Sequence, residues 1–427
     1  MTRARDALRA ARPLAGLVAL LGVAGCHGPT PLAPSSEPEL RIGLGVGLPR
    51  VTLGSTDGGE LIVTAEAAGE PIGSVPVGTT WTVVPDSAGL RVVRPDGSRS
   101  AVHRRITGVN VTEGRFASAN GRRYRGRLQV VRDRAGLTLV NRVALESYLA
   151  GVVGVEMGPR RPNEVQALLA QAVVSRTVGL RNRGRWESLG FDLWGDVRDQ
   201  AYGGVGAEHP AVGDAVRRTA GQVIRYQGEV IDAFFHSTCG FSTAGLAEAF
   251  ATSQGRSYLR PVSDASGGDT YYCDIAPHFR WREEWDRAAL RAVLARTLPA
   301  FADVGSDGGS DDTLPRITDL RVTRTTRSGR VGELRIDLEG GREVRVAASD
   351  VRRVLRPDTG RWLGSSAFQL QVARRDGEVS EVVASGAGWG HGVGMCQWGA
   401  VGRARAGQDY RRILETYFPG TRVERAY

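Results

Sequence analysis

The periodicity of apolar residues changes near residue 141, and this change constrains the fold more than any other feature of the chain. From 41 to 140, short apolar runs alternate with Gly, Asp and Pro turns, which predicts short strands joined by tight turns. Behind the N-cap candidate Asn163, apolar residues recur at helical spacing over 164–181, which predicts a long helix. The other expected elements are a β-hairpin at 222–235, strands over 317–384, and helices at 211–219, 281–298 and 408–417. The predicted class is α+β, with a β-rich N-terminal part at 41–140 and a mixed α/β core at 141–427.

The first forty residues indicate the cellular compartment. Arginines precede the apolar run Leu14–Gly25, which is shorter than the roughly 20 residues that a membrane-spanning helix needs. Residues 1–25 therefore read as a secretory signal peptide. Residues 23–26 resemble a bacterial lipobox, in which Cys26 would be lipidated; a plain signal peptide with a coincidental cysteine is the alternative. With a Pro-rich tether at 26–40, we expect an extracytoplasmic, lipid-anchored protein, in the periplasm or at the outer membrane if the cell is Gram-negative.

The cations exclude several classes of function. The chain has 56 Lys and Arg residues and a net charge of +10, but all of these cations are arginines. The absence of lysine excludes a lysine Schiff base, a P-loop lysine and a kinase-type catalytic lysine. Because the arginines are scattered along the chain, we expect no nucleic-acid partner.

Two charged residues are candidates for chemistry. Glu156 ends the apolar run VVGVEM, so a partly desolvated position would raise its pKa toward that of a general acid. The alternative is a surface glutamate at the turn before the helix. Arg176 lies among apolar and small residues of the predicted helix, where it needs either a structural carboxylate or a polar substrate. These residues alone leave both choices open.

Cysteine and histidine residues form a second group of candidates. His236 and Cys239 lie in FFHSTCG, and Cys273 and His278 lie in YYCDIAPHF. Together they supply four ligands of the types that bind zinc in closed structural sites. An extracytoplasmic compartment equally permits a Cys239–Cys273 disulfide, and a third alternative is that neither forms.

A glycine-dense segment at 386–400, GAGWGHGVGMCQWGA, indicates close backbone approach or positive φ angles. It does not follow a βαβ unit, so it does not predict a dinucleotide site. Trp389, His391, Gln397 and Trp398 could line a groove in which indole faces stack on sugar rings. Packing within the glycine-rich turn is the alternative.

Several segments together resemble the SpoIID/LytB family, named for stage II sporulation protein D and the amidase enhancer LytB. The resemblance covers roughly 41–422 and is strongest after residue 143. The segments that carry it are VALESYLAGVVGVEM, EVQALLAQAVVSRT, DQAYGG, FFHSTCGFSTA, YLRPV, GWGHGVGMCQWGA and YRRILETYFPGT. The chain departs from the family pattern in a longer EMGPRRP turn and in Phe241, which replaces a glycine.

The resemblance implies a SpoIID-like core with a substrate groove and a lytic transglycosylase activity. Such an enzyme cleaves peptidoglycan between N-acetylmuramic acid and N-acetylglucosamine and forms a 1,6-anhydro sugar. By correspondence of motifs, Glu156 would be the catalytic acid, assisted by Arg176 and Tyr258. Substrate-binding residues would be Tyr202, Arg260, Trp389, His391 and Gln397. The chemistry would require no cofactor, while some family members bind zinc near the STCG segment, so a structural zinc is also implied.

Two other functions remain open at this point. The protein could be a non-catalytic wall-binding lipoprotein that stimulates an amidase, which would add a partner to the glycan strands and the membrane. It could also be a zinc hydrolase, although a site filled by four protein ligands leaves no position for a reactive water.

Overall fold

The computed structural model describes residues 36–55, 58–65, 69–250, 254–301, 314–357 and 359–427. The predicted signal peptide at 1–25, the lipidation candidate Cys26 and most of the 26–40 tether lie outside the described residues. The described end of the tether leads into the first strand, β1 (Glu39–Leu48). Within the described ranges, no helix is both long and apolar enough to cross a membrane.

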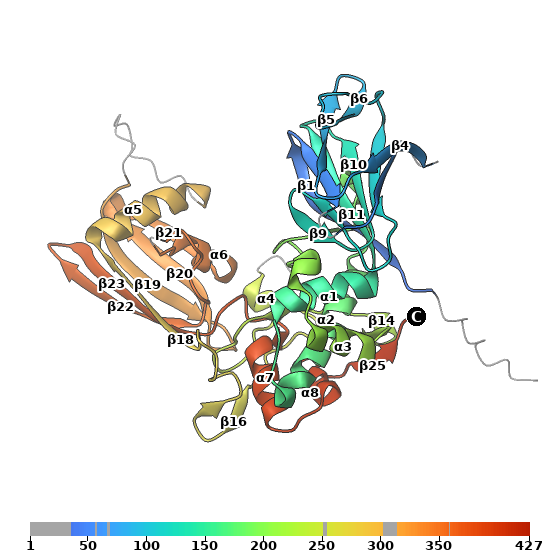
Figure 1. Ribbon diagram of the computed structural model, residues 1–427. Helices are drawn as coiled ribbons and strands as arrows, with labels where there is room; N and C mark the ends of the chain where they lie inside the picture. The colour runs from blue at the N-terminus through green and yellow to red at the C-terminus, as the bar shows by residue number, and fades with distance from the viewer. Residues whose placement is uncertain (1–35, 56–57, 66–68, 251–253, 302–313, 358) are drawn as a thin grey trace, which may run out of the picture. The chain divides into compact units, whose positions relative to one another are not determined.

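The N-terminal part forms two sheets of antiparallel strands, as its alternating sequence predicts (Figure 1). The exception is the edge strand β12 (Leu193–Trp194), which comes from later in the chain and pairs in parallel with β1. One sheet has the order β12-β1-β11-β10-β7-β3-β4 and the other has the order β6-β5-β2-β8-β9. Alternate residues are buried in several strands, for example Leu61, Val63 and Ala65 of β3, which places one face of such a strand against the core. The strand β11 is instead buried on both faces over most of its length. The strands are β2 (Val51–Ser55), β3 (Leu61–Ala65), β4 (Glu70–Val75), β5 (Thr80–Asp86), β6 (Gly89–Val93), β7 (Arg105–Asn110), β8 (Ala117–Ala119), β9 (Arg122–Tyr124), β10 (Arg127–Arg132), β11 (Leu137–Ala144) and β12 (Leu193–Trp194).

Helices dominate the region that follows. The helix α2 (Val165–Arg181) is buried along most of its length and contacts α1, α3, α7 and α8. The other helices are α1 (Leu145–Glu156), α3 (Pro210–Arg218), α4 (Leu246–Ala249), α7 (Gln397–Arg405) and α8 (Tyr410–Tyr417). Short strands accompany them: β13 (Gln222–Tyr226), β14 (Glu229–Val230), β15 (Phe235–His236), β16 (Ala265–Gly267), β17 (Thr270–Tyr271), β24 (Met395–Cys396) and β25 (Arg422–Arg425).

Residues between β17 and β24 build a region with a separate hydrophobic core. Its two three-stranded sheets have the orders β18-β23-β22 and β19-β20-β21, and Leu290, Val293 and Val351 from its helices are buried in the same core. The elements are β18 (Arg280–Asp286), α5 (Arg287–Thr297), β19 (Ile317–Thr325), β20 (Val331–Leu338), β21 (Arg342–Ala347), α6 (Ala348–Val354), β22 (Phe368–Arg375) and β23 (Glu378–Ala387).

The predicted α+β class is confirmed, and so are the helices near 164–181, 211–219 and 408–417. The predicted helix at 281–298 is wrong over its first third, because residues 280–286 form β18. Asp286 accepts a hydrogen bond from Ala289 N (2.8 Å) and caps α5, so the helix begins only after this residue. The hairpin predicted at 222–235 is shorter than expected, because β14 ends at Val230.

Candidate active site

Glu156 is the last residue of α1, and the local sequence explains why the helix ends there. Gly158 adopts a positive φ of 62°, a conformation that glycine tolerates and that commonly terminates helices. Pro159 follows and cannot continue the helix. The backbone carbonyl of Glu156 accepts a hydrogen bond from Gln397 Nε2 (3.4 Å), which connects the end of α1 to the first turn of α7.

The carboxyl group of Glu156 is largely removed from water. Burial raises its pKa, and hydrogen bonds from Ala201 N to Oε1 (3.1 Å) and from the Gln397 side chain oppose this effect only in part. The position at the C-terminal end of a helix adds to the effect, because the negative end of the helix dipole disfavours a carboxylate. A raised pKa increases the fraction of Glu156 that carries a proton, as a general acid requires.

Glu156 lines a cavity of about 520 Å³. This volume falls within the range of ligand-binding pockets. The cavity combines aromatic rings with charged and amide groups; its lining residues are Glu156, Val178, Asn182, Arg185, Val197, Arg198, Asp199, Gln200, Asp232, Ala233, Phe234, Phe235, Phe250 and His391.

Three carboxylates line this cavity, and only two of them have an arginine partner within the described part of the chain. Asp199 pairs with Arg185 (2.9 Å), and Asp232 pairs with Arg181 (3.0 Å). Asp199 also accepts hydrogen bonds from Trp186 Nε1 and the Trp194 backbone, and its side chain has no exposed surface. Glu156 has no arginine partner in the described part of the chain. It is therefore the carboxyl group of the cavity best suited to hold a proton.

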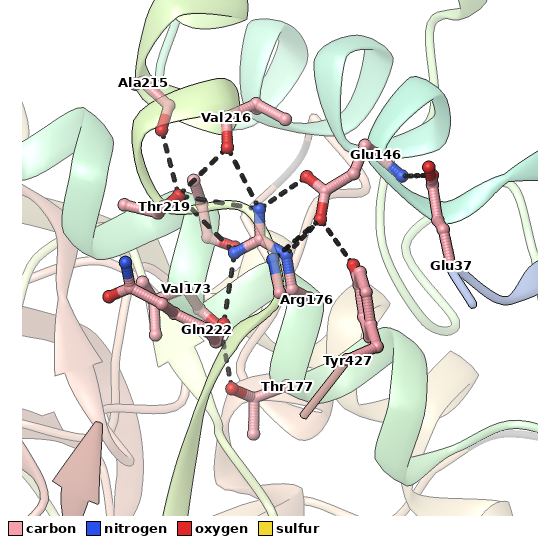
Figure 2. Close-up of polar contacts among 12 residues, drawn as sticks. Glu37, Glu146, Val173, Arg176, Thr177, Ala215, Val216, Thr219, Gln222 and Tyr427 are labelled. Carbon is pink, nitrogen blue, oxygen red and sulfur yellow. Dashed lines mark hydrogen bonds and ion pairs between the residues drawn. The ribbon is translucent and has the colours of Figure 1, made fainter. Parts of the chain in front are cut away.

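Arg176 does not reach the cavity. Figure 2 shows its guanidinium enclosed by Glu146, Thr219 and backbone carbonyls. Nε and Nη2 donate to the two carboxylate oxygens of Glu146 (2.8 and 2.6 Å), and the arginine is completely buried. The prediction of a catalytic Arg176 is therefore corrected: the residue is one half of a structural ion pair.

Two tyrosines also lie outside the cavity lining. Tyr202 was predicted to bind substrate, but it is 5% exposed and its hydroxyl donates to Asn141 Oδ1 (2.9 Å). Tyr258 was predicted to be catalytic, but its hydroxyl contacts Asp232, accepting from the backbone N–H (3.3 Å) and donating to Oδ2 (3.4 Å). Tyr258 therefore positions a lining residue rather than facing substrate.

The remaining substrate-binding candidates divide into two groups. His391 lines the cavity as predicted; burial lowers its pKa to about 3, so the imidazole is neutral. Gln397 contacts the Glu156 backbone without lining the cavity. Trp389 and Arg260 do not line the cavity either. The Trp389 ring stacks on His278, with the ring centroids 4.5 Å apart, and Arg260 is exposed.

The predicted zinc ligands do not come together. Only two of them, Cys239 and Cys273, belong to a cluster that also contains Asp264 and Cys396. His236 is buried elsewhere, with Nδ1 3.1 Å from the Val393 carbonyl oxygen, and the exposed His278 lies against Trp389. The sulfur atoms of Cys239 and Cys273 are 3.5 Å apart, so the alternative disulfide is not formed in this structure.

Sequence reasoning missed most of the cavity lining. Asn182 and Arg185 follow the end of α2, and residues 197–200 come from an irregular segment after β12. Their only sequence signal is the cluster of charged residues around Trp194, which does not by itself indicate a cavity. Cys396 was overlooked as a metal ligand because it lies more than 100 positions from the other cysteines.

The sequence also matches known proteins. Residues 133–226 match the family model of Stage II sporulation protein, SpoIID. Over these residues the chain is similar to the SpoIID domain. This domain contains α1 and α2, and therefore both Glu156 and Arg176. Residues 268–394 match a domain of unknown function, DUF8618, which includes the region with the separate hydrophobic core.

Three relatives extend the likeness beyond the SpoIID domain. An uncharacterized protein of Brachyspira hyodysenteriae is 29% identical over 310 residues, 71% of this chain and 73% of that protein. Stage II sporulation protein D of Bacillus amyloliquefaciens is 26% identical over 312 residues, 67% of this chain and 76% of the relative. The amidase enhancer of Bacillus subtilis is 26% identical over 303 residues, 61% of this chain but only 39% of that protein. The SpoIID domain and these names support a role connected with the cell wall.

Proposed function

We propose that this protein is a lytic transglycosylase that cleaves peptidoglycan strands between N-acetylmuramic acid and N-acetylglucosamine. The observation that carries the proposal is the carboxyl group of Glu156, which lines the cavity, has a raised pKa and has no cationic partner among the described residues. The resemblance of the EM segment to the family's catalytic motif supports the same residue.

The chemistry requires one group that first donates and then accepts a proton. Protonated Glu156 donates to the glycosidic oxygen as the bond from the muramic acid C1 to that oxygen breaks, and N-acetylglucosamine leaves with a free hydroxyl. The resulting carboxylate then takes the proton of the C6 hydroxyl while O6 bonds to C1. Water is not consumed, and Glu156 ends protonated as it began. Because the nucleophile belongs to the same sugar, its approach costs little entropy.

The absence of an unpaired second carboxylate in the described lining supports this reaction over hydrolysis. A glycoside hydrolase usually uses one carboxyl group as acid and another as base or nucleophile. Asp199 and Asp232 also line the cavity, but each is bound by an arginine and by neighbouring hydrogen-bond partners. These contacts give the two aspartates structural roles in the cavity wall.

The lining offers both contact types that a sugar strand needs. Phe234, Phe235 and Phe250 supply apolar rings, while Asn182 and Arg198 supply hydrogen-bond donors. We propose that the strand lies against these side chains outside the cell membrane, with the chain anchored by a lipid on Cys26. The lipid anchor and the extracytoplasmic location rest on the N-terminal sequence alone.

The decisive experiment incubates purified protein with isolated sacculi and identifies soluble products by mass spectrometry. We expect anhydro-muropeptides from the wild type and a loss of about two to four powers of ten in rate for Glu156→Gln, which keeps the size of the side chain. Glu424→Gln, at an exposed glutamate of β25, is the matched control and should be as active as the wild type. Undiminished product release by Glu156→Gln would remove this residue from the mechanism.

One relative's name supports a second candidate function. The amidase enhancer of Bacillus subtilis suggests a link to a wall amidase, and this chain could likewise bind wall and stimulate such an enzyme. The same assay separates the two functions when it is repeated with a purified amidase. Products that appear only in the presence of the amidase, and equally with Glu156→Gln, would favour the enhancer role.

A further inference from the structure

We propose that this chain holds a structural zinc ion in a buried site different from the one its histidines suggest. The ligands are Cys239, Asp264, Cys273 and Cys396. Their ligand atoms all lie within 4.8 Å of one another, and all four residues are fully buried. The proposal is independent of the transglycosylase reaction, because none of these residues lines the cavity.

The spacing of the cluster suits a tetrahedral metal site. Two thiolates on one zinc ion, each about 2.3 Å from the metal, lie about 3.8 Å apart. Cys239 Sγ and Cys273 Sγ are 3.5 Å apart, close to that separation and far from the roughly 2.05 Å of a disulfide. Three sulfurs and one carboxylate form a ligand set of the kind that zinc accepts.

The fold brings the ligands together from distant parts of the chain. β15 and β24 pair in parallel, with His236 opposite Cys396, so Cys396 lies beside the turn that carries Cys239. Asp264 immediately precedes β16, and Cys273 comes soon after β17, its partner in a small hairpin. The Cys273 backbone N–H donates to Asp264 Oδ2 (3.0 Å), which holds the two ends of this hairpin together.

Cys396 has the surroundings of a thiolate. Its sulfur accepts hydrogen bonds from the backbone N–H groups of Cys239 and Gly399 (both 3.2 Å). It also caps the N-terminus of α7, where the helix dipole favours a negative charge. Burying a thiolate is costly unless positive charge offsets it, and a metal ion bound directly to this sulfur would supply that charge.

Two buried arginines provide independent evidence for a negative centre. Arg330 is 2% exposed and donates through Nη2 to the Cys239 carbonyl (2.9 Å), while its Nε and Nη1 have no hydrogen-bond partner in the described structure. No carboxylate of the described residues forms an ion pair with it. Arg403 is 6% exposed, and its Nη2 lies 3.3 Å from Asp264 Oδ1.

The charges of the site balance when zinc is present. Three thiolates and one carboxylate carry four negative charges, and zinc reduces this to two, which matches the two guanidinium groups. Without a metal and with neutral thiols, Arg330 would remain buried with no counter-charge, a costly arrangement. Four protein ligands leave no open coordination position, so the ion would stabilise the fold and take no part in catalysis.

The test measures metal content directly. The full chain is purified without chelators, and zinc is determined by inductively coupled plasma mass spectrometry. We expect about one zinc ion per chain for the wild type and less than about a tenth of that for Cys396→Ser, which removes a thiolate ligand. The matched control is His278→Ala, which removes an exposed histidine of the alternative ligand set and should retain the zinc of the wild type.

A second measurement keeps the test decisive if Cys396→Ser fails to fold. Wild-type protein is loaded with Co²⁺ in place of zinc, and its absorption spectrum is recorded. Sulfur-to-cobalt charge-transfer bands with intense tetrahedral d–d bands support the site. A wild type without zinc, with a Cys239–Cys273 disulfide in its non-reduced peptide map, would overturn the proposal. Loss of zinc from His278→Ala would overturn the ligand assignment.

Discussion

The two ends of α1 each carry a partly buried glutamate, and the two glutamates have opposite electrostatic properties. Glu146, in the first turn, accepts two hydrogen bonds from Arg176, one from Gly221 N (3.1 Å) and one from Tyr427 (Figure 2). Burial alone would raise its pKa, but these partners hold the pKa below its ordinary value. Glu156, in the last turn, has hydrogen bonds from Ala201 N and the Gln397 side chain but no arginine partner among the described residues, and its pKa is raised.

The comparison shows that burial alone does not determine the role of a carboxyl group. A buried guanidinium converts Glu146 into a permanent anion that connects α1, α2 and the C-terminal residue. The helix dipole increases the difference between the two pKa values, because it favours a negative charge at the first turn of α1 and disfavours one at the last. Leaving Glu156 without a cation costs stability and makes a proton available at the cavity.

The largest effect on stability should come from Arg176→Leu. This change leaves Glu146 without its buried partner, and breaking a buried pair in this way costs about 3–5 kcal/mol of unfolding free energy. Urea denaturation followed by circular dichroism measures the loss. Arg181→Leu, at a half-exposed arginine of the same helix, is the control and should cost less than about 1 kcal/mol. Equal losses in the two variants would contradict the structural role of Arg176.

Glu146→Gln should have a smaller effect of about 1–3 kcal/mol, because glutamine retains an acceptor for Arg176. The wild-type contribution depends on pH with a definite sign. Since folding lowers the pKa of Glu146, its stabilisation is present at neutral pH and is lost as the pH falls through the folded-state value. Urea titrations at neutral and acidic pH should show the difference between wild type and variant shrinking toward acid. A constant difference would argue against a charged Glu146.

The pH dependence of catalysis should report the ionisation of Glu156. Only the protonated acid can begin the reaction, so kcat/KM should fall about tenfold per pH unit above the pKa of the free enzyme. Burial places this falling limb above the range of an ordinary glutamate. The rate of release of anhydro-muropeptides from sacculi across a pH series provides the measurement. A falling limb centred at or below the pKa of a solvent-exposed glutamate would contradict the proposed acid.

The smallest effect concerns the stability of Glu156→Gln. Because folding raises the pKa of Glu156, ionising this group disfavours the folded state as pH rises, and glutamine removes that cost. We expect the variant to be as stable as the wild type in acid and more stable, by up to about 1 kcal/mol, at neutral pH. Thermal unfolding at both pH values tests this. A variant less stable than the wild type at neutral pH would indicate that Glu156 is a structural anion.

Local patterns predicted much of the fold, because they depend on neighbouring residues. The β-rich N-terminal part and the helix at 164–181 follow from periods of two and 3.6 residues. The strand at 280–286 was mistaken for helix because Trp281 and Trp285 are spaced four apart and also fall on one face of a helix. The capping aspartate between the strand and α5 was the signal that would have corrected this.

The candidate site was less predictable, because its properties arise from contacts between distant residues. The sequence indicated Glu156 and His391, both of which line the cavity. It could not reveal that Glu146, thirty positions before Arg176, binds this arginine, nor that Cys396 joins Cys239 across 157 positions. Motif resemblance identifies which positions recur in a family, but it does not distinguish a residue that faces substrate from one that holds the helix beneath it.

A direct titration of the two glutamates tests the central claim. Protein labelled with ¹³C at glutamate side chains is titrated by NMR, and the two signals are assigned with Glu146→Gln and Glu156→Gln. We expect Glu156 to titrate above, and Glu146 below, the ordinary pKa of a glutamate. A Glu156 that titrates at or below the ordinary value would contradict the account, because its carboxyl group would then hold no proton for the glycosidic oxygen at neutral pH.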